Sequence, residues 1–313
     1  MKHFVLAGLF AGVMALPAAA DYTIIAPAAP GGGWDQTART MQTVMQEEGI
    51  SKSTQVQNVP GAGGTIGLAQ FASQNKGNPD ALIVGGYVMV GAILTNKSPV
   101  SLKDVTPIAR LTGEYEAIVV PAASPIQDMK GLIDALKADP GAVSWAGGSA
   151  GGTDHIAVGM IAKAAGVDPT KINYIAYSGG GEALAAILGN QVTAGVSSLG
   201  EFEAQVKAGA LRLLAISSPE PVEGVDAPTL IDSGVDVSLE NWRMVAAAPG
   251  ITDEQKAKIS ADIEKMVKSE NWQKQLADKG WADTYLSGAD FDAQLEKDVA
   301  ATEAVLKDIG LVQ

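Results

Sequence analysis

Four glycine-rich turns carry the residues in this sequence that are best suited to hold an anion: 31–35, 61–65, 147–153 and 178–181. Each turn follows a short apolar run and precedes a segment with helical spacing. The first amides of a helix have no partner within the helix, and the helix dipole adds partial positive charge there. Because glycine has no side chain to cover these amides, the turns predict a binding site for a carboxylate.

The candidate ligand contacts are the residues of these turns together with their nearest polar and aromatic neighbours: Gly31, Gly32, Gly33, Trp34, Asp35, Gly63, Gly64, Thr65, Tyr87, Ser149, Gly152, Thr153, His155, Ser178, Gly179 and Gly180. Several of them have a structural alternative. Asp35, Thr65 and Ser178 are residues that also cap helices. Trp34 suits either the core or the wall of a cleft, and His155 suits either a structural hydrogen bond or a ligand contact.

Four stretches resemble, in order along the chain, the extracytoplasmic solute-binding proteins of tripartite tricarboxylate transporters. They are Pro30-Gly31-Gly32-Gly33-Trp34-Asp35 with Ala38-Arg39, then residues 59–64, 151–155 and 177–184. The Gly-Gly-Gly-Trp-Asp form resembles the citrate-binding branch of that family. The resemblance implies a two-domain α/β protein with the type II periplasmic binding-protein fold, closing like a hinge on a ligand in the cleft.

The same resemblance implies the ligand and the partners. The ligand would be a small organic carboxylate, with citrate or a related tricarboxylate first and a dicarboxylate as the alternative. The protein would act as a monomer in the periplasm and deliver its ligand to a membrane permease of two other subunits.

An enzyme is the competing hypothesis, because Gly147-Gly148-Ser149-Ala150-Gly151 matches the G-x-S-x-G pattern of a hydrolase nucleophile turn. That fold needs a histidine well downstream of the serine, whereas beyond residue 20 the chain has only His155, six residues on. The chain also has no cysteine, and no glycine cluster reads G-x-G-x-x-G. We therefore expect a binding protein that is not an enzyme and needs no metal or cofactor.

Residues 1–20 have the features of a cleavable secretory signal: a basic start, an apolar run too short to span a bilayer, and a small-residue cleavage site. The net charge of −13 becomes −14 once Lys2 is removed with this segment. Nucleic acid is thereby excluded as a partner, since binding it needs basic patches. A carboxylate must then be held mainly by local amides, with at most one or two basic side chains from Arg39, Arg110, Arg212 and Arg243.

The order of strand, turn and helix predicts an α/β fold with a mostly parallel sheet. Separate strands are expected at residues 105–111 and 117–120, and a helix with a capping box begins at Thr252. The proline-bounded segment 121–125 is expected to mark a domain crossing. The predicted division is 21–120 for domain 1, 121–240 for domain 2, and 241–313 for the return to domain 1.

Overall fold

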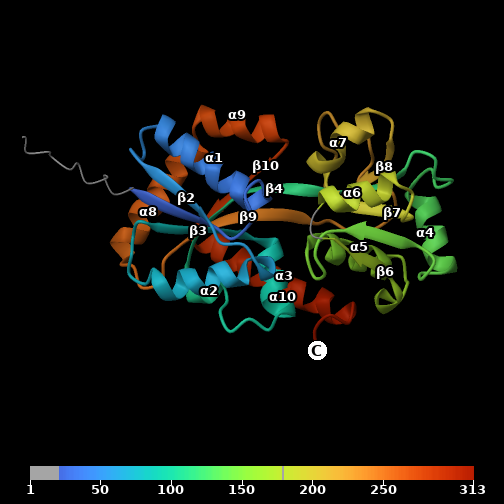
Figure 1. Ribbon diagram of the computed structural model, residues 1–313, viewed down its shortest axis with the longest axis horizontal. Coiled ribbons are helices and arrows are strands. Elements are labelled where there is room, and N and C mark those ends of the chain that lie inside the picture. Colours follow the sequence, from blue (N-terminus) through green and yellow to red (C-terminus); the bar gives the residue numbers. More distant parts are fainter. Residues whose placement is uncertain (1–20, 178–179) are drawn as a thin grey trace, which may run out of the picture.

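The computed structural model describes residues 21–177 and 180–313, which form two halves lying side by side (Figure 1). The first half holds β1 (Tyr22–Ala26), β2 (Thr54–Asn58) and β3 (Ala81–Gly86), and the second holds β5 (Ser144–Gly147), β6 (Asn173–Ala176) and β7 (Ala194–Ser198). The predicted signal segment 1–20 lies outside the described residues, as do Ser178 and Gly179. Within the described ranges, no helix is both long enough and apolar enough to cross a membrane.

The strands have these bounds: β1 (Tyr22–Ala26), β2 (Thr54–Asn58), β3 (Ala81–Gly86), β4 (Thr106–Pro121), β5 (Ser144–Gly147), β6 (Asn173–Ala176), β7 (Ala194–Ser198), β8 (Leu211–Ile216), β9 (Glu240–Ala247) and β10 (Ala282–Ser287). The helices are α1 (Gly33–Glu47), α2 (Thr65–Gln74), α3 (Tyr87–Thr95), α4 (Met129–Ala138), α5 (Thr153–Ala164), α6 (Gly180–Leu188), α7 (Leu199–Lys207), α8 (Asp253–Val267), α9 (Glu270–Lys279) and α10 (Gly288–Asp308).

One strand, β4, joins the two halves. Its residues up to Tyr115 pair with β9 and β10, whereas from Glu116 onward it pairs with β7 and β8. The prediction of two separate strands was wrong. Glu114 and Glu116 interrupt the apolar pattern, but the backbone stays extended because it is hydrogen-bonded to neighbouring strands on both sides of this point.

The prediction of a mostly parallel sheet was also wrong. The strands follow the order β2-β1-β3-β9-β4-β7-β5-β6, with β8 and β10 also paired to β4. The pairs within β1–β3 and within β5–β7 are parallel, but every described pair that involves β4 or β9 is antiparallel. The repeated βα units thus build each half, while antiparallel strands connect them.

The C-terminal helix α10 also reaches both halves. It packs on α3 in the first half, and its last turn lies against α5 in the second. Lys163 of α5 forms an ion pair with Asp308, and a Cβ added at Gly159 would lie 2.3 Å from Ile309. The proposed division at residues 120 and 240 falls at the end of β4 and the start of β9, and it remains a prediction.

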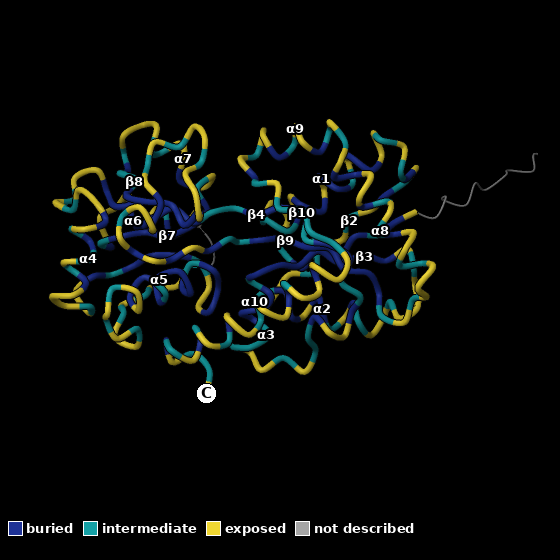
Figure 2. Tube along the Cα trace, turned by 180° about the vertical axis from the view of Figure 1, so that it is seen from behind, coloured by how far each residue is buried: buried dark blue, intermediate teal, exposed yellow. Residues whose placement is uncertain are grey.

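Helices cover both faces of the sheet, whose strands form the buried interior (Figure 2). In the first half, α1, α8 and α9 pack on one face, and α2, α3 and α10 on the other. In the second half, α6 and α7 cover one face, and α4 and α5 the other. The predicted capping box of α8 is confirmed, with Thr252 and Gln255 each bonded to the other's backbone amide.

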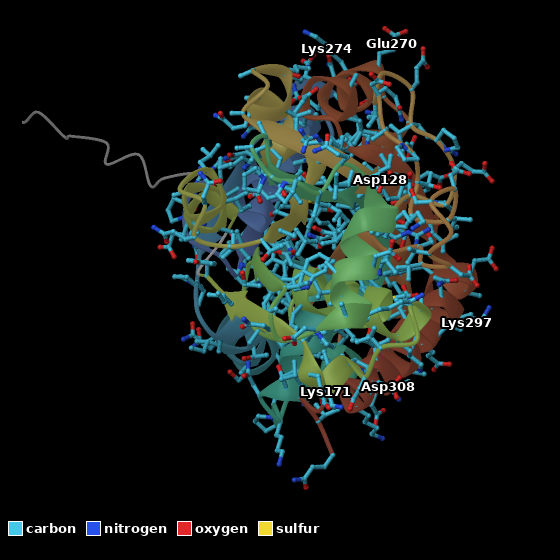
Figure 3. All side chains as sticks on the ribbon, turned by 90° about the vertical axis from the view of Figure 1, so that its right-hand side faces the viewer. Asp128, Lys171, Glu270, Lys274, Lys297 and Asp308 are labelled. Carbon is cyan, nitrogen blue, oxygen red and sulfur yellow. The ribbon has the colours of Figure 1, made fainter. Side chains whose placement is uncertain are left out.

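Charged side chains project outward from the helices and turns (Figure 3). Lys171, Glu270 and Lys297 are exposed examples from both halves. Exposed charges of both signs therefore lie on the solvated surface of both halves.

Candidate functional site

A cavity of about 610 Å³ lies between the two halves, and three helices begin at its wall. These helices are α1, α5 and α7, whose N-cap residues Gly32, Gly152 and Ser198 provide no side-chain cap. The residues that line the cavity are Ala28, Gly31, Gly32, Gly33, Trp34, Gln36, Val88, Glu114, Gly148, Ser149, Gly152, Thr153, Asp154, Ser197, Ser198, Gly200, Glu201, Asn241, Arg243, Asp278, Lys279 and Trp281. Such an arrangement directs the positive ends of three helix dipoles toward one space.

The wall contributed by the first half is built on the turn before α1. Gly31 has a φ of +85°, which favours glycine, and Gly32 is extended. A Cβ at Gly33 would lie 2.7 Å from Nη2 of Arg243. Glycine at this position therefore lets the guanidinium lie against the start of α1.

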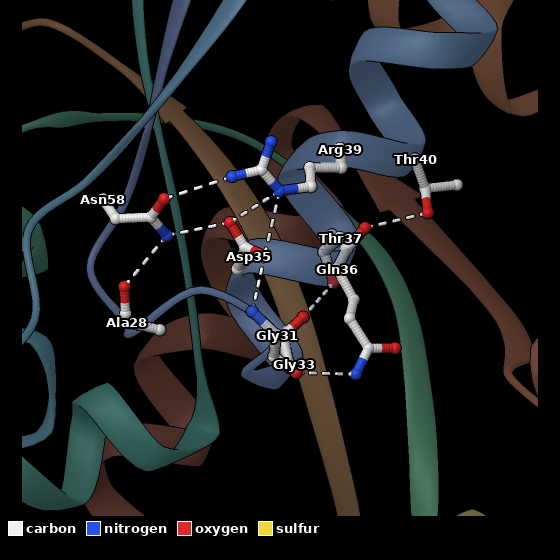
Figure 4. A network of polar contacts seen from close by, with 9 residues as sticks. All are labelled: Ala28, Gly31, Gly33, Asp35, Gln36, Thr37, Arg39, Thr40 and Asn58. Atoms are coloured by element: carbon white, nitrogen blue, oxygen red, sulfur yellow. Dashed lines mark hydrogen bonds and ion pairs between the residues drawn. The ribbon is translucent and has the colours of Figure 1, made fainter.

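Asp35 lies behind this wall and holds the turn in shape (Figure 4). The carboxylate accepts hydrogen bonds from the Gly31 amide at 2.8 Å, from Arg39 Nε at 3.0 Å and from Asn58 Nδ2 at 2.8 Å. Although burial opposes ionisation, these donors lower the pKa of Asp35 below its usual value. Asp35 is only 2% exposed and is not among the residues that line the cavity. Its geometry therefore fits a residue that stabilises the start of α1, and not one that contacts a ligand.

Arg243 is the buried cation of the cavity. Its Nη2 pairs with Glu114, and its Cζ lies 4.8 Å from the ring centroid of Trp281. Glu114 also accepts hydrogen bonds from Trp281 Nε1 at 3.0 Å and from Ser198 Oγ at 3.2 Å. Nη1 of Arg243 is buried and has no hydrogen-bond partner among the described residues. Glu114 and the Trp281 ring therefore hold the guanidinium in place at the cavity wall.

The wall contributed by the second half begins at the turn before α5. Asp154 Oδ2 accepts a hydrogen bond from the Gly148 amide at 2.6 Å, much as Asp35 does from Gly31. The hydroxyl of Thr153 is buried and lacks a partner in the described chain. Burial raises the pKa of Asp154 to about 6, and the nearby Glu201 carboxylate acts in the same direction.

A third carboxyl, Glu116, lies behind Asp154 and Glu201. It is fully buried, and its carboxyl lies within hydrogen-bonding reach of the Asp154 carboxyl. Burial, with the charges of Asp154, Glu114 and Glu201, raises the pKa of Glu116 well above its usual value. Ser197 donates a hydrogen bond to Glu201. This side of the cavity is therefore rich in carboxyl groups.

The structure brings part of the predicted site together. The predicted residues that line the cavity are Gly31, Gly32, Gly33, Trp34, Ser149, Gly152 and Thr153. Gly63 lines a smaller adjoining pocket, which shares Val88, Ser149 and Gly152 with the cavity. Ser178 and Gly179 lie outside the described residues, and Gly180 is the first residue of α6.

Other predicted residues are engaged away from the cavity. Gly64 has a φ of +88° and packs so closely on Trp34 that a Cβ would lie 2.7 Å from its ring. The Thr65 hydroxyl donates to the Ala62 carbonyl at 2.9 Å. Tyr87 is buried with its ring centroid 6.1 Å from that of Trp242, and burial raises its pKa to about 12.

His155 is also held in a structural arrangement. Its Nδ1 accepts a hydrogen bond from the Gly151 amide at 3.2 Å, and its ring stacks on Tyr174 with the ring centroids 4.1 Å apart. Burial lowers the pKa of His155 to about 4, so the ring is neutral at pH 7. Since the ring is committed to these contacts and does not line the cavity, His155 is not placed as a general base for Ser149.

Arg243 is the member of the four-arginine candidate set that lines the cavity. Arg39 pairs with Asp35, Arg110 donates to the Thr284 carbonyl, and Arg212 donates to the carbonyls of Ala122, Ser124 and Ile126. Sequence reasoning did not find Glu114, Glu201 or Trp281. One feature of the sequence could have marked Glu114 as a candidate: it and Glu116 are carboxylates within an otherwise apolar strand.

A family model and a curated relative both match most of this chain. Residues 37–311 match the model described as the tripartite tricarboxylate transporter family receptor. Protein BugT of Bordetella pertussis is 28% identical over 234 residues, covering 74% of this chain and 71% of its own length. These matches span both halves of the fold.

Solved structures of similar proteins support the same family and fold. A TctC solute-binding protein from Polaromonas, without ligand, is 26% identical with a TM-score of 0.75, covering 91% of this chain and 97% of its own. An R. palustris protein with adipate is 21% identical with a TM-score of 0.79, covering 92% and 97%. The predicted family and the α/β binding-protein fold are thereby confirmed. These proteins are receptors for solutes, which also confirms the prediction of a binding protein over a hydrolase.

Proposed function

This chain belongs to the tripartite tricarboxylate transporter receptor family, and we propose that it captures a small organic carboxylate in the cavity between its two halves. The observation that carries the proposal is the meeting of three helix N-termini without side-chain caps at one cavity. Backbone amides at such positions bind anions even in a protein of strongly negative net charge. The adipate held by the R. palustris neighbour is consistent with this ligand class.

Citrate and the dicarboxylates differ in how well they suit the charges of the cavity. The lining residues include four carboxylates, Glu114, Asp154, Glu201 and Asp278, against the two cations Arg243 and Lys279. Each negative charge on a ligand adds to this excess, and the low dielectric of a closed cavity strengthens the repulsion. This balance favours a ligand with fewer negative charges than citrate, so we place a dicarboxylate ahead of the tricarboxylate.

The site residues, compartment and partners belong to the same proposal. The glycine turns before α1 and α5, with Trp34, Ser149 and Thr153, would contact the ligand. A signal at residues 1–20 would direct the chain to the periplasm, where it would deliver its ligand as a monomer to membrane permease subunits.

Thr153→Val tests the site because valine has nearly the shape of threonine but lacks the hydroxyl. We expect binding of the best organic acid, found in a thermal-shift screen and measured by titration calorimetry, to weaken about tenfold, the loss expected for one hydrogen bond to a charged group. The melting temperature without ligand should not fall, since the hydroxyl has no partner in the described chain.

Thr40→Val is the matched control, because the Thr40 hydroxyl donates to the Gln36 carbonyl at 2.8 Å on α1 and does not line the cavity. It should leave affinity unchanged. Equal affinity of the wild type and Thr153→Val would refute this placement of the site. A screen in which no organic acid binds would refute the function itself.

A further inference from the structure

A second cavity lies behind the strands that join the two halves. In β9, Asn241 and Arg243 line the cavity described above, whereas Glu240 and Trp242 line a smaller one of about 230 Å³. Successive side chains of a strand point to opposite faces of the sheet, so the two cavities lie on opposite faces of β9. We call the larger one the front cavity, and the side that holds the smaller one the back of the joint.

Both halves contribute to the back of the joint. The smaller cavity is lined by Tyr87 of α3, by Ala301 and Val305 of α10, and by Met160 of α5. The first half thus provides α3 and α10, and the second half provides α5. In Figure 1 these three helices lie below β4 and β9, whereas α1, α7 and α9 lie above them. The back is therefore an interface between the halves, separated from the front cavity by the joining strands.

Two glycines allow close contact across this interface. A Cβ at Gly159 of α5 would lie 2.3 Å from Cγ2 of Ile309, the residue that follows α10. A Cβ at Gly91 of α3 would lie 2.3 Å from the carbonyl oxygen of Gly151, in the turn before α5. Glycine inside a helix is less favourable than alanine. The close approach of the two halves accounts for glycine at both positions.

The helix α5 connects the back of the joint with the front cavity. Its first residues, Thr153 and Asp154, line the front cavity, and its later residues Gly159 and Met160 lie at the back. Hydrogen bonds along its length make such a helix rigid. A displacement of α5 relative to α10 therefore also moves one wall of the front cavity.

The chain crosses between the halves at neighbouring points of two strands. One crossing is in β4, between Tyr115 and Glu116, and the other is at the start of β9, where Glu240 pairs with Tyr115. A rotation about these strands that narrows the front cavity widens the back, because the two lie on opposite faces. Contacts at the back oppose that rotation. If a ligand binds to the narrowed form, its affinity is reduced by the fraction of molecules in that form.

We propose that the back of the joint sets the equilibrium between open and closed arrangements of the two halves, and that the contact between α5 and the end of α10 opposes closure. The inference goes beyond the proposed function, which names the ligand class and not what controls the movement of the halves. Weakening this contact should tighten ligand binding, although neither Gly159 nor Ile309 lines the front cavity.

Gly159→Ala tests the proposal, because the added methyl group would force α5 and Ile309 apart. We expect the organic acid that binds best in the thermal-shift screen to bind at least about threefold tighter in titration calorimetry, since more molecules would occupy the closed form. Small-angle X-ray scattering of the ligand-free variant should give a smaller radius of gyration than that of the wild type.

Gly195→Ala is the matched control for this variant. Its methyl group would lie 2.0 Å from Cδ1 of Ile187, but both residues belong to the second half. It should lower the melting temperature and leave both the affinity and the radius of gyration unchanged.

Ile309→Ala removes the same contact without adding bulk, so the test does not depend on the folding of one variant. Ile309 is only 7% exposed, and its truncation should also tighten binding at least about threefold. The control is Ile259→Ala, which truncates a buried isoleucine of α8 on the other face of the first half. That variant should lose stability without gaining affinity.

The outcomes separate this inference from the proposed function. If Gly159→Ala and Ile309→Ala both bind the ligand no more tightly than the wild type does, the back of the joint does not oppose closure and the inference is overturned. If no organic acid binds to any form of the protein, the proposed function falls, and the scattering measurement alone decides. A radius of gyration equal to that of the wild type in both variants then overturns the inference.

Discussion

The turns before α1 and α5 have the same local design but opposite electrical surroundings. In each, glycines precede a helix, and an aspartate in its first turn accepts a hydrogen bond from a glycine amide: Asp35 from Gly31 and Asp154 from Gly148. Asp35 is also bonded to Arg39 and Asn58, whereas Asp154 lies near Glu116 and Glu201. The first carboxylate has a lowered pKa and the second a raised one.

This difference shows that a glycine turn closed by an aspartate determines the shape of the loop but not the charge that it presents to a ligand. The charge depends on side chains from distant strands. Arg243 comes to the first wall from β9, and Glu116 comes to the second from β4.

Removing the cation of the first wall should have the largest effect on stability. Arg243→Met leaves Glu114, whose side chain is 13% exposed, without its ion-pair partner. An uncompensated buried charge of this kind typically costs about 3 kcal/mol. Urea unfolding should show that loss, and Glu114→Gln in the same chain should recover most of it. A loss below about 1 kcal/mol would mean that the pair contributes little.

The two aspartates should respond differently to the same substitution. Asp35→Asn weakens hydrogen bonds from Arg39 and Gly31 and should cost about 2 kcal/mol at pH 7. Asp154→Asn should be neutral or stabilising there, because it removes a negative charge from beside Glu116 and Glu201. If urea unfolding shows that both variants are destabilised equally, the two aspartates do not differ in the way proposed.

The pH dependence of stability should also distinguish Asp154→Asn from the wild type. Because the pKa of Asp154 is raised to about 6 in the folded state, the folded protein holds more protons than the unfolded chain between about pH 4 and 6, and the contribution of Asp154 to stability falls as pH rises through that range. The lowered pKa of His155 has the opposite effect over the same range. The stability of Asp154→Asn relative to the wild type should therefore rise by about 2 kcal/mol between about pH 4 and pH 7. A constant difference would contradict the assignment.

A smaller effect should follow from adding a methyl group to the first wall. Gly33→Ala places its Cβ against Nη2 of Arg243 and should cost about 1 kcal/mol. Because the cost comes from this contact, it should largely disappear in an Arg243→Met background. Gly32→Ala is the control, since its nearest neighbours are Ala29 and Ala28, and its cost should be the same in both backgrounds.

The smallest expected effect is that of salt on ligand affinity. Buried amides, and charges paired within a closed cavity, are screened much less than surface charges, so the dissociation constant should change less than about threefold between about 20 and 500 mM sodium chloride. A steep, monotonic loss of affinity measured by calorimetry would indicate that exposed cations dominate the attraction.

The sequence determined the local chemistry of this protein. The glycine turns, the capping box at Thr252 and the βα order of each half all depend on residues close together in the chain, and the family followed from those motifs. The shape of the loop before α1 likewise depends on Gly31 and Asp35, which are four residues apart.

Tertiary structure decided which residues meet at the cavity and which charges they carry. Glu114 and Arg243 are 129 residues apart, and pair because β4 and β9 run antiparallel through the point where the halves join. Local spacing could not show that β4 is one strand serving both halves, nor which of four arginines reaches the cavity. Pairing across strands and burial determine these features, because the free energy of a charge depends on neighbours that the fold brings from far along the chain.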